Sequence, residues 1–135
     1  MHYGVEVVPE QAGDEFKRWI GGFYEGAYSC NPIWEPDFQT FPKHPITRGV
    51  TPFQIKDEWY FNIRFADHFD ADGSKEADGV KFTPILVVKP SDAVRGGPYV
   101  YPQGPYQHIV DASGRNEAMM WAIERSDGGR GFGFT

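Results

Sequence analysis

The sequence has little cysteine, no long hydrophobic run and no cluster of basic residues. Cys30 is the single cysteine among 135 residues, so the chain cannot form an internal disulfide. No apolar stretch approaches the roughly 20 residues that a membrane-spanning helix needs. The formal net charge is -6, and polyanion binding depends on clustered Lys and Arg. We therefore expect a chain that binds neither a membrane nor a nucleic acid.

Motifs for several common reactions are also missing. No serine or cysteine lies in a G-x-S-x-G context, so covalent acyl chemistry is not indicated. The four histidines lack metal-ligand spacing, and His44, which precedes Pro45, is expected to order a turn. Segment 70–79 (DADGSKEADG) begins like a calcium loop but has Lys75 where glycine is needed and Lys81 where glutamate is needed. An exposed acidic turn is the better interpretation.

Two features of the sequence bear on the cellular compartment. The first residues, MHYGVEVVPEQ, have neither the basic start nor the apolar core of a secretion signal. Lone Cys30 fits a reduced environment and is expected to be a small buried hydrophobe. We expect a cytoplasmic protein, unless a secretion signal precedes Met1.

The chain has the length of one domain, which we assign to residues 1–135. Within PEQAGDEFKRWIGGFYEG, apolar side chains recur at helical spacing, and acidic residues precede basic ones. This pattern predicts one amphipathic helix that the pair Gly21-Gly22 ends. Its apolar stripe consists of Phe16, Trp19, Ile20 and Phe23.

Other segments predict strands. Five prolines between residues 27 and 55 exclude a long helix and favour short strands and turns. The run FTPILVVK (82–89) is typical of a central strand covered on both faces. AMMWAIER and GFGFT flank a glycine turn and predict a C-terminal β-hairpin. The Pro, Gly and Tyr-rich segment 90–117 is expected to be a functional or mobile loop.

Segment 57–65 (DEWYFNIRF) alternates between apolar and polar side chains and predicts a strand with one core face. The expected core face consists of Trp59, Phe61, Ile63 and Phe65. The opposite face consists of Glu58, Tyr60, Asn62 and Arg64. If this second face borders solvent, it is an ordinary polar face. If it lines a pocket, it offers an acid/base carboxylate, a phenol and two polar groups suited to a hydroxyl-rich ligand.

The motif RGFGF at 130–134 matches part of the aromatic strand signature of RNA-recognition domains. The acidic charge opposes RNA binding, and no helix and further strand follow in the sequence. The favoured interpretation is a strand whose small glycines alternate with Phe132 and Phe134, both packed in the core.

The order of these segments resembles the ThuA-like, trehalose-utilisation family. The resemblance lies in MHYGVEV, GDEFKRWIGG, KHPITRGVTPFQIKDEWYF, FTPILVV and AMMWAIERSDGGRGFGFT, and is weak across 90–117. It implies an α/β fold: a partial flavodoxin-like sandwich, as in class I glutamine amidotransferases, rich in strands. It also implies a role in carbohydrate utilisation, on trehalose or an oxidised sugar.

The resemblance covers only the middle and C-terminal part of the family domain. It implies a domain truncated at both ends, without the first strands and helices and without a Gly-Gly-His-like turn and last helix. His2-Tyr3 stands where an amidotransferase places its cysteine, so glutaminase activity is not expected. The open sheet edges of such a chain favour pairing with a second copy.

The resemblance and the polar strand face together suggest a site. His2 and Glu58 are the candidate catalytic residues, as proton-transfer or metal-ligating groups, although no metal is specified. Tyr60, Arg64 and Tyr3 are the candidate substrate-binding residues, with a small carbohydrate as the partner. The alternative is a non-catalytic carbohydrate-binding or structural chain that uses a tyrosine-rich loop, with RNA binding as a third hypothesis. That loop contains Tyr99, Tyr101 and Tyr106.

Overall fold

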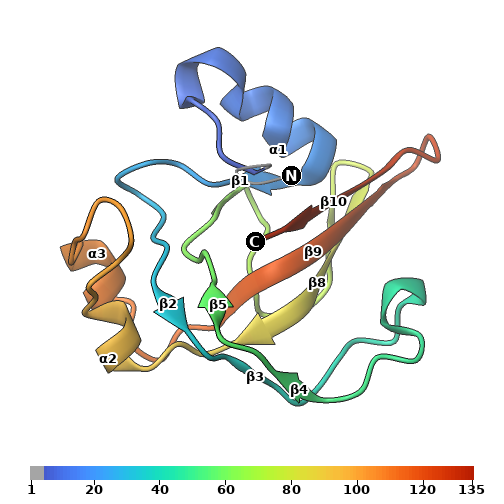
Figure 1. Ribbon diagram of the computed structural model, residues 1–135. Coiled ribbons are helices and arrows are strands. Elements are labelled where there is room, and N and C mark those ends of the chain that lie inside the picture. Colours follow the sequence, from blue (N-terminus) through green and yellow to red (C-terminus); the bar gives the residue numbers. More distant parts are fainter. Residues whose placement is uncertain (1–4) are drawn as a thin grey trace.

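A four-stranded antiparallel sheet lies at the centre of the fold (Figure 1). The computed structural model describes residues 5–135. Neighbouring strands follow the order β10-β9-β8-β7. Their bounds are β7 Lys75–Ala77, β8 Val80–Val88, β9 Glu117–Arg125 and β10 Arg130–Phe134.

The long strands form where the sequence predicted them. In β8, residues 82–86 are all buried, and β7 and β9 flank the strand, which confirms the prediction of a central strand. The hairpin of β9 and β10 is also confirmed. The Arg125 N–H donates to the Gly129 carbonyl at 2.8 Å, and the Gly129 N–H donates to the Asp127 carboxylate at 2.7 Å.

Three short antiparallel strand pairs surround this sheet. They are β1 Gly22–Phe23 with β6 Arg64–Phe65, β2 Ile33–Trp34 with β5 Asp57–Glu58, and β3 Asp37–Phe38 with β4 Phe53–Gln54. The strands within 27–55 are short, as the prolines of that segment indicated. Between β3 and β4, a 3-10 turn (η2, Pro45–Thr47) is capped by His44, whose Nδ1 accepts from the Ile46 N–H at 3.3 Å. His44 therefore orders this turn, as predicted.

The prediction of one continuous strand over 57–65 is wrong. Only β5 and β6 pair as strands, because Asn62 adopts a left-handed backbone with φ 56° between them, a conformation that Asn tolerates better than most residues. Trp59, Phe61 and Ile63 are buried as expected. Tyr60 and Asn62 are buried too, so the opposite side is not a uniform polar face.

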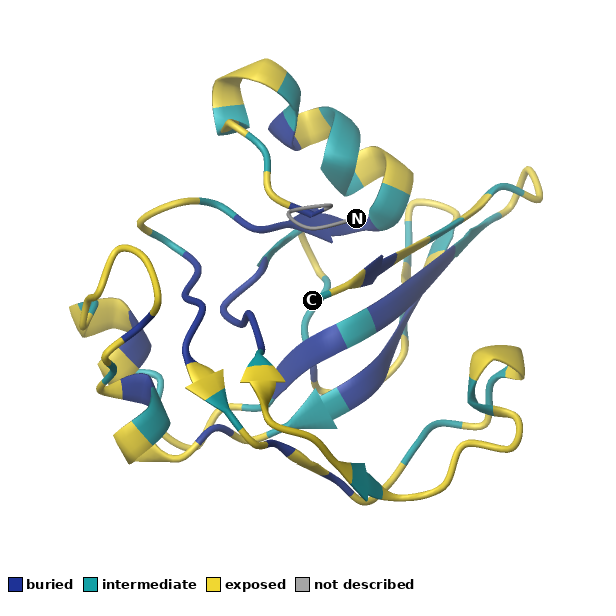
Figure 2. Ribbon diagram, viewed as in Figure 1, coloured by how far each residue is buried: buried dark blue, intermediate teal, exposed yellow. Residues whose placement is uncertain are grey.

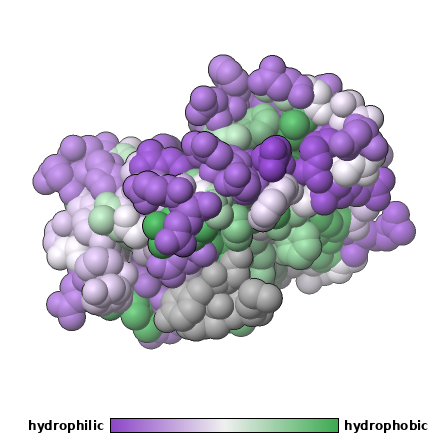
Figure 3. Space-filling model, turned by 90° about the horizontal axis from the view of Figure 1, so that it is seen from above, coloured by the Kyte–Doolittle hydropathy of each residue, from purple (hydrophilic) through white to green (hydrophobic). Residues whose placement is uncertain are grey.

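The amphipathic helix forms α1 (Asp14–Ile20), preceded by a π-helical turn (η1, Pro9–Gly13). Gly21 ends it with φ 90°, a left-handed conformation that glycine adopts without strain. The predicted apolar stripe forms only in part. Phe23 is buried and Ile20 packs against the core, but Trp19 is 52% exposed and the helix itself has no fully buried residue. The face of the molecule that carries α1 is mostly hydrophilic, with hydrophobic side chains gathered across its middle (Figure 3).

Side chains of β9 hold the C-terminal end of α1. Trp121 Nε1 donates to the Ile20 carbonyl at 2.5 Å, and Arg125 Nη1 donates to the Arg18 and Trp19 carbonyls, both at 3.1 Å. These carbonyls have no partner inside the helix, and a guanidinium suits the negative end of the helix dipole. These polar contacts therefore dock the helix together with the apolar side chain of Ile20, which packs against the core.

Segment 90–117 is ordered in part by two short helices, α2 (Asp92–Arg95) and α3 (Gln107–Val110). The two lie side by side, away from α1 (Figure 1). Ser91 caps α2 by accepting from the Val94 N–H at 3.3 Å. The segment thus brings Arg95, which is buried, against the start of β9.

The core lies mainly along β8 and β9 (Figure 2). The two phenylalanines of β10 do not join it fully: Phe132 is 59% and Phe134 is 49% exposed. The expectation that both rings pack in the core is therefore wrong. The glycines of β10 make the close contacts instead, because a Cβ on Gly131 would lie 2.1 Å from the Trp19 carbonyl oxygen.

The expected mixed α/β class is confirmed at this coarse level, with antiparallel pairing throughout the named strands. Among residues 5–135, no helix has the length and apolarity to cross a membrane.

Candidate functional site

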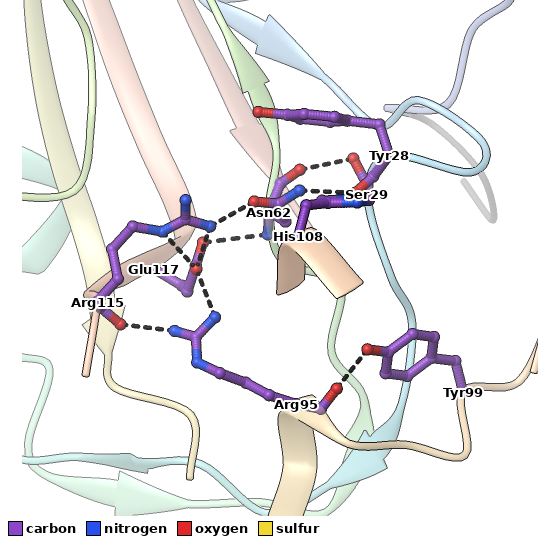
Figure 4. A network of polar contacts seen from close by, with 8 residues as sticks. All are labelled: Tyr28, Ser29, Asn62, Arg95, Tyr99, His108, Arg115 and Glu117. Atoms are coloured by element: carbon purple, nitrogen blue, oxygen red, sulfur yellow. Dashed lines mark hydrogen bonds and ion pairs between the residues drawn. The ribbon is translucent and has the colours of Figure 1, made fainter. Parts of the chain in front are cut away.

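An ion triad, in which Arg95 and Glu117 are buried, lies where the start of β9 meets α2 (Figure 4). Arg95 is fully buried, and its Nη1 donates to Glu117 Oε1 at 3.1 Å. Arg115 approaches the same oxygen with Nε at 3.0 Å and Nη2 at 2.7 Å. Arg95 Nη2 also donates to the Arg115 carbonyl at 2.7 Å. One carboxylate therefore fixes two guanidinium groups from different parts of the chain.

Asn62 connects this triad to the loop before β2. Its backbone N–H donates to Glu117 Oε2 at 3.1 Å, and its side-chain oxygen accepts from Arg115. Its Nδ2 donates to the Tyr28 carbonyl at 2.6 Å, while Ser29 Oγ donates to the Asn62 carbonyl at 2.8 Å. The left-handed backbone of Asn62 thus serves to direct every polar group of this residue into the network.

A pocket of about 470 Å³ opens beside the network. Polar and charged side chains dominate its wall. They come from α1, from the loop before β2, from 62–72 and from the start of β9: Lys17, Tyr28, Asn62, Arg64, Asp67, His68, Asp70, Asp72, Arg115, Asn116 and Glu117. A pocket of this kind suits a small ligand rich in hydroxyl groups.

Arg64 is positioned on the pocket wall by two contacts. Its Nε donates to Glu25 at 2.6 Å, and its guanidinium carbon lies 3.4 Å from the centre of the Tyr28 ring, a cation-π arrangement. The hydrogen bond to Glu25 raises the pKa of Arg64, against the opposing effect of partial burial. Arg64 is therefore a preorganised cation.

Acidic groups occupy another part of the same wall. Asp70 pairs with Lys75, and Asp72 accepts from Asn116 Nδ2 at 2.9 Å. Partial burial opposes ionisation of Asp70, but the Lys75 hydrogen bond, the Asp72 N–H and the Lys75 charge together hold the pKa of Asp70 below its usual range. The pocket therefore offers both acceptors and donors.

A stack of three rings includes Tyr28, which lines the pocket. Tyr28 and His108 stack with centroids 5.5 Å apart, and Tyr106 lies on His108 at 5.7 Å. A His108 ring nitrogen lies 2.8 Å from the Tyr28 carbonyl. Because α3 supplies His108, the tyrosine-rich segment helps to position Tyr28 and, through it, Arg64.

The structure separates the residues that the sequence grouped as a site. Arg64 lines the pocket, but Glu58 does not. Glu58 Oε1 accepts from Asn31 Nδ2 at 2.9 Å in the β2–β5 region, and Tyr60 is buried with its ring 5.0 Å from that of Tyr24. His2 and Tyr3 lie outside the described residues.

The tyrosines of segment 90–117 also have separate roles. Tyr99 is buried and its hydroxyl donates to the Arg95 carbonyl, whereas Tyr101 is exposed. Tyr99 borders a second, more apolar groove of about 520 Å³ with Trp34 and Val94. Tyr106 packs edge-to-face on Tyr99, with ring centroids 5.5 Å apart, so Tyr101 is the one of the three that lies apart and exposed.

Two further observations concern the state of Cys30 and the possible ligands for a metal ion. Cys30 is fully buried, as predicted. Burial, together with the nearby Glu117 charge, raises the pKa of its thiol far above the usual range, so the thiol stays protonated. Within residues 5–135, no group of three or more His, Cys, Asp or Glu side chains is arranged to hold a metal ion.

Sequence reasoning did not find Arg95, Arg115 or Glu117. Arg95 lies in a segment expected to be a loop, and Glu117 immediately precedes the apolar run of β9. One signal was available: charged residues adjoining an apolar strand end are buried only when they are paired. Comparison of the chain with protein-family models, with curated proteins and with solved structures finds no match.

Proposed function

We propose that this chain is the middle and C-terminal part of a ThuA-like domain that acts in carbohydrate utilisation, and that the polar pocket binds the sugar. The family assignment rests on the sequence resemblance, and the flavodoxin-like sandwich is proposed with it as the fold of the whole domain. The partner is a small carbohydrate such as trehalose or an oxidised sugar.

The observation that carries the proposal is the composition of the pocket wall. It combines the cations Lys17 and Arg64, the amide of Asn62 and several carboxylates around about 470 Å³. Sugar hydroxyls donate and accept hydrogen bonds, so a wall with both kinds of partner suits them.

Replacement of Arg64 by Gln tests this proposal. Loss of the guanidinium removes hydrogen bonds from a charged donor, so we expect sugar affinity to fall about tenfold, or about 1.4 kcal/mol. Isothermal titration calorimetry with trehalose, glucose and their keto derivatives measures the change. Arg130→Gln is the matched control, because Arg130 is exposed on β10. No binding of any of these sugars to the unmodified chain would contradict the proposal.

On the sequence resemblance, we propose the chemical step for Glu58, with His2 as its partner. Because Glu58 does not line the polar pocket, the reacting part of the sugar would have to extend beyond the pocket wall. Asn31 holds one oxygen of Glu58 at 2.9 Å, so the carboxylate is oriented for proton transfer. Glu58→Gln should reduce turnover of the sugar at least about tenfold, equivalent to about 1.4 kcal/mol. Steady-state kinetics of the full chain test this prediction, with Glu35→Gln as an exposed control. Unchanged kinetics would remove Glu58 from the site.

Two other functions have weaker support. Sugar binding with no turnover in the unmodified chain would favour the non-catalytic carbohydrate-binding function. The exposed rings of Phe132 and Phe134 are the one observation in favour of RNA, and the net charge of -6 opposes it. A salt-dependent mobility shift with single-stranded RNA would be needed to support that third hypothesis.

A further inference from the structure

We propose that the ligand of the polar pocket is a sugar acid, a carbohydrate that carries one carboxylate, and that Arg115 binds this carboxylate. The inference rests on the proposed sugar-binding function and specifies the ligand class and the residue that selects it.

The first argument concerns which N–H donors of Arg115 already have an acceptor within the protein. A guanidinium has five N–H donors. The Nε–H and one Nη2–H of Arg115 go to Glu117, and the second Nη2–H goes to Asn62. Both N–H donors of Nη1 remain available to a ligand, since no hydrogen bond joins them to any residue in 5–135. Figure 4 shows this nitrogen on the side of the guanidinium away from Glu117.

The second argument is charge. In the triad, two guanidinium groups face the single carboxylate of Glu117. Arg95 is fully buried and can be tolerated there only if Glu117 neutralises it. The charge of Arg115 is then in excess, and its side chain is 45% exposed and borders the pocket. Lys17, on the same wall, has no ion pair among the described residues.

The third argument is rigidity. Arg115 is held by Glu117 and Asn62, and Asn62 is held in turn by the Tyr28 carbonyl. A fixed guanidinium loses little conformational entropy when it binds an anion, so more of the interaction free energy appears as affinity. Among the groups that an oxidised sugar can carry, a carboxylate has the geometry that best matches a guanidinium.

The acidic part of the wall limits the charge of the ligand. Asp67, Asp70 and Asp72 line the same pocket, so a phosphate dianion would be repelled there more than a monoanionic carboxylate. The same carboxylates accept hydrogen bonds from hydroxyl groups. A ligand with one carboxylate at the Arg115 end and hydroxyls elsewhere satisfies both parts of the wall.

The test compares glucuronate with glucose, two sugars that differ in one carboxylate, by isothermal titration calorimetry on the full chain. We expect glucuronate to bind at least about tenfold more tightly than glucose at low ionic strength, with a preference that falls as salt is added. Arg115→Gln should abolish the preference, Arg115→Lys should keep part of it, and Arg130→Gln should leave it unchanged. Circular dichroism spectra establish that each variant is folded.

The outcomes separate this inference from the function on which it rests. Equal affinities for glucuronate and glucose in the unmodified chain overturn the inference and leave sugar binding intact. Tighter binding of glucose 6-phosphate than of glucuronate overturns the assignment of a carboxylate, and a preference that survives Arg115→Gln overturns the role of Arg115. Absence of binding by all three sugars, and also by trehalose and the keto derivatives, overturns the proposed function itself.

Discussion

Replacement of Glu117 by Gln should lower the free energy of unfolding by about 3–5 kcal/mol, the cost of removing one partner from a buried ion pair. The substitution changes the side-chain volume very little, so the effect comes from charge and hydrogen bonding. Arg95 would keep its positive charge at a position with no exposure to solvent. The desolvation of that charge is then no longer offset by a neighbouring carboxylate.

The hydrogen bonds around Glu117 make the glutamine side chain especially unfavourable. Oε1 accepts from both arginines, and Oε2 accepts from the Asn62 N–H at 3.1 Å. A glutamine has one acceptor oxygen and one NH2 donor group. In either orientation its NH2 group faces a donor, either a guanidinium or the Asn62 N–H. The buried donor on that side loses its acceptor, which adds to the cost.

Urea unfolding followed by tryptophan fluorescence measures this change, and an unchanged m-value would show that the unfolded state is not altered. Glu124→Gln is the control on the same strand. Glu124 is partly exposed, and its contacts to His44 and Lys81 are long, at 3.9 and 4.0 Å, so we expect a change within about 0.5 kcal/mol. Equal effects of the two substitutions would mean that the triad is not a stabilising element.

The elements that the sequence predicted correctly are those whose patterns are local. The apolar run of β8 and the Asp127-Gly128-Gly129 turn need only neighbouring residues, and both form as predicted. The prediction of one continuous strand over 57–65 failed because period-two alternation does not reveal one residue with a left-handed backbone, Asn62. Because the backbone of this segment turns at Asn62, Tyr60 and Asn62 are buried and do not lie on the polar face that the alternation predicted.

The site was predictable only in part, because its residues meet through tertiary contacts. Arg64 was identified from the pattern of its own segment and does line the pocket. Arg95 and Glu117 are 22 positions apart, and α2 has no periodic pattern that would orient Arg95 toward β9. Tertiary contacts determine which residues pair with a buried charge, so a pattern of neighbouring residues in the sequence cannot identify these partners.

Replacement of Gly131 by Ala should destabilise the protein by about 2–3 kcal/mol, in the upper part of the range for overpacking. In an ordinary strand the change has the opposite sign, because glycine costs about 0.5–1 kcal/mol relative to alanine. Here the new Cβ would lie 2.1 Å from the Trp19 carbonyl oxygen and 3.2 Å from the Ile20 Cα. Both are backbone atoms of α1, so the helix itself must move.

That movement would also break the contacts that fix the end of α1. Trp121 donates to the Ile20 carbonyl and Arg125 to the Trp19 carbonyl, so a displaced helix leaves these acceptors without partners. The same reasoning explains why β10 presents its phenylalanines outward: the small residues are needed on the side that α1 covers.

Thermal and urea unfolding of three variants tests this account of β10. Gly26→Ala is the matched control, because no atom lies within 4 Å of its added Cβ, and we expect it to be neutral or stabilising by up to about 1 kcal/mol. Phe132→Ala removes a far larger side chain, yet its ring is mostly exposed, so we expect a loss below about 1 kcal/mol. If Phe132→Ala costs more than Gly131→Ala, the phenylalanine packs in the core as the sequence first indicated. The close contact between β10 and α1 would then not be what requires glycine at position 131.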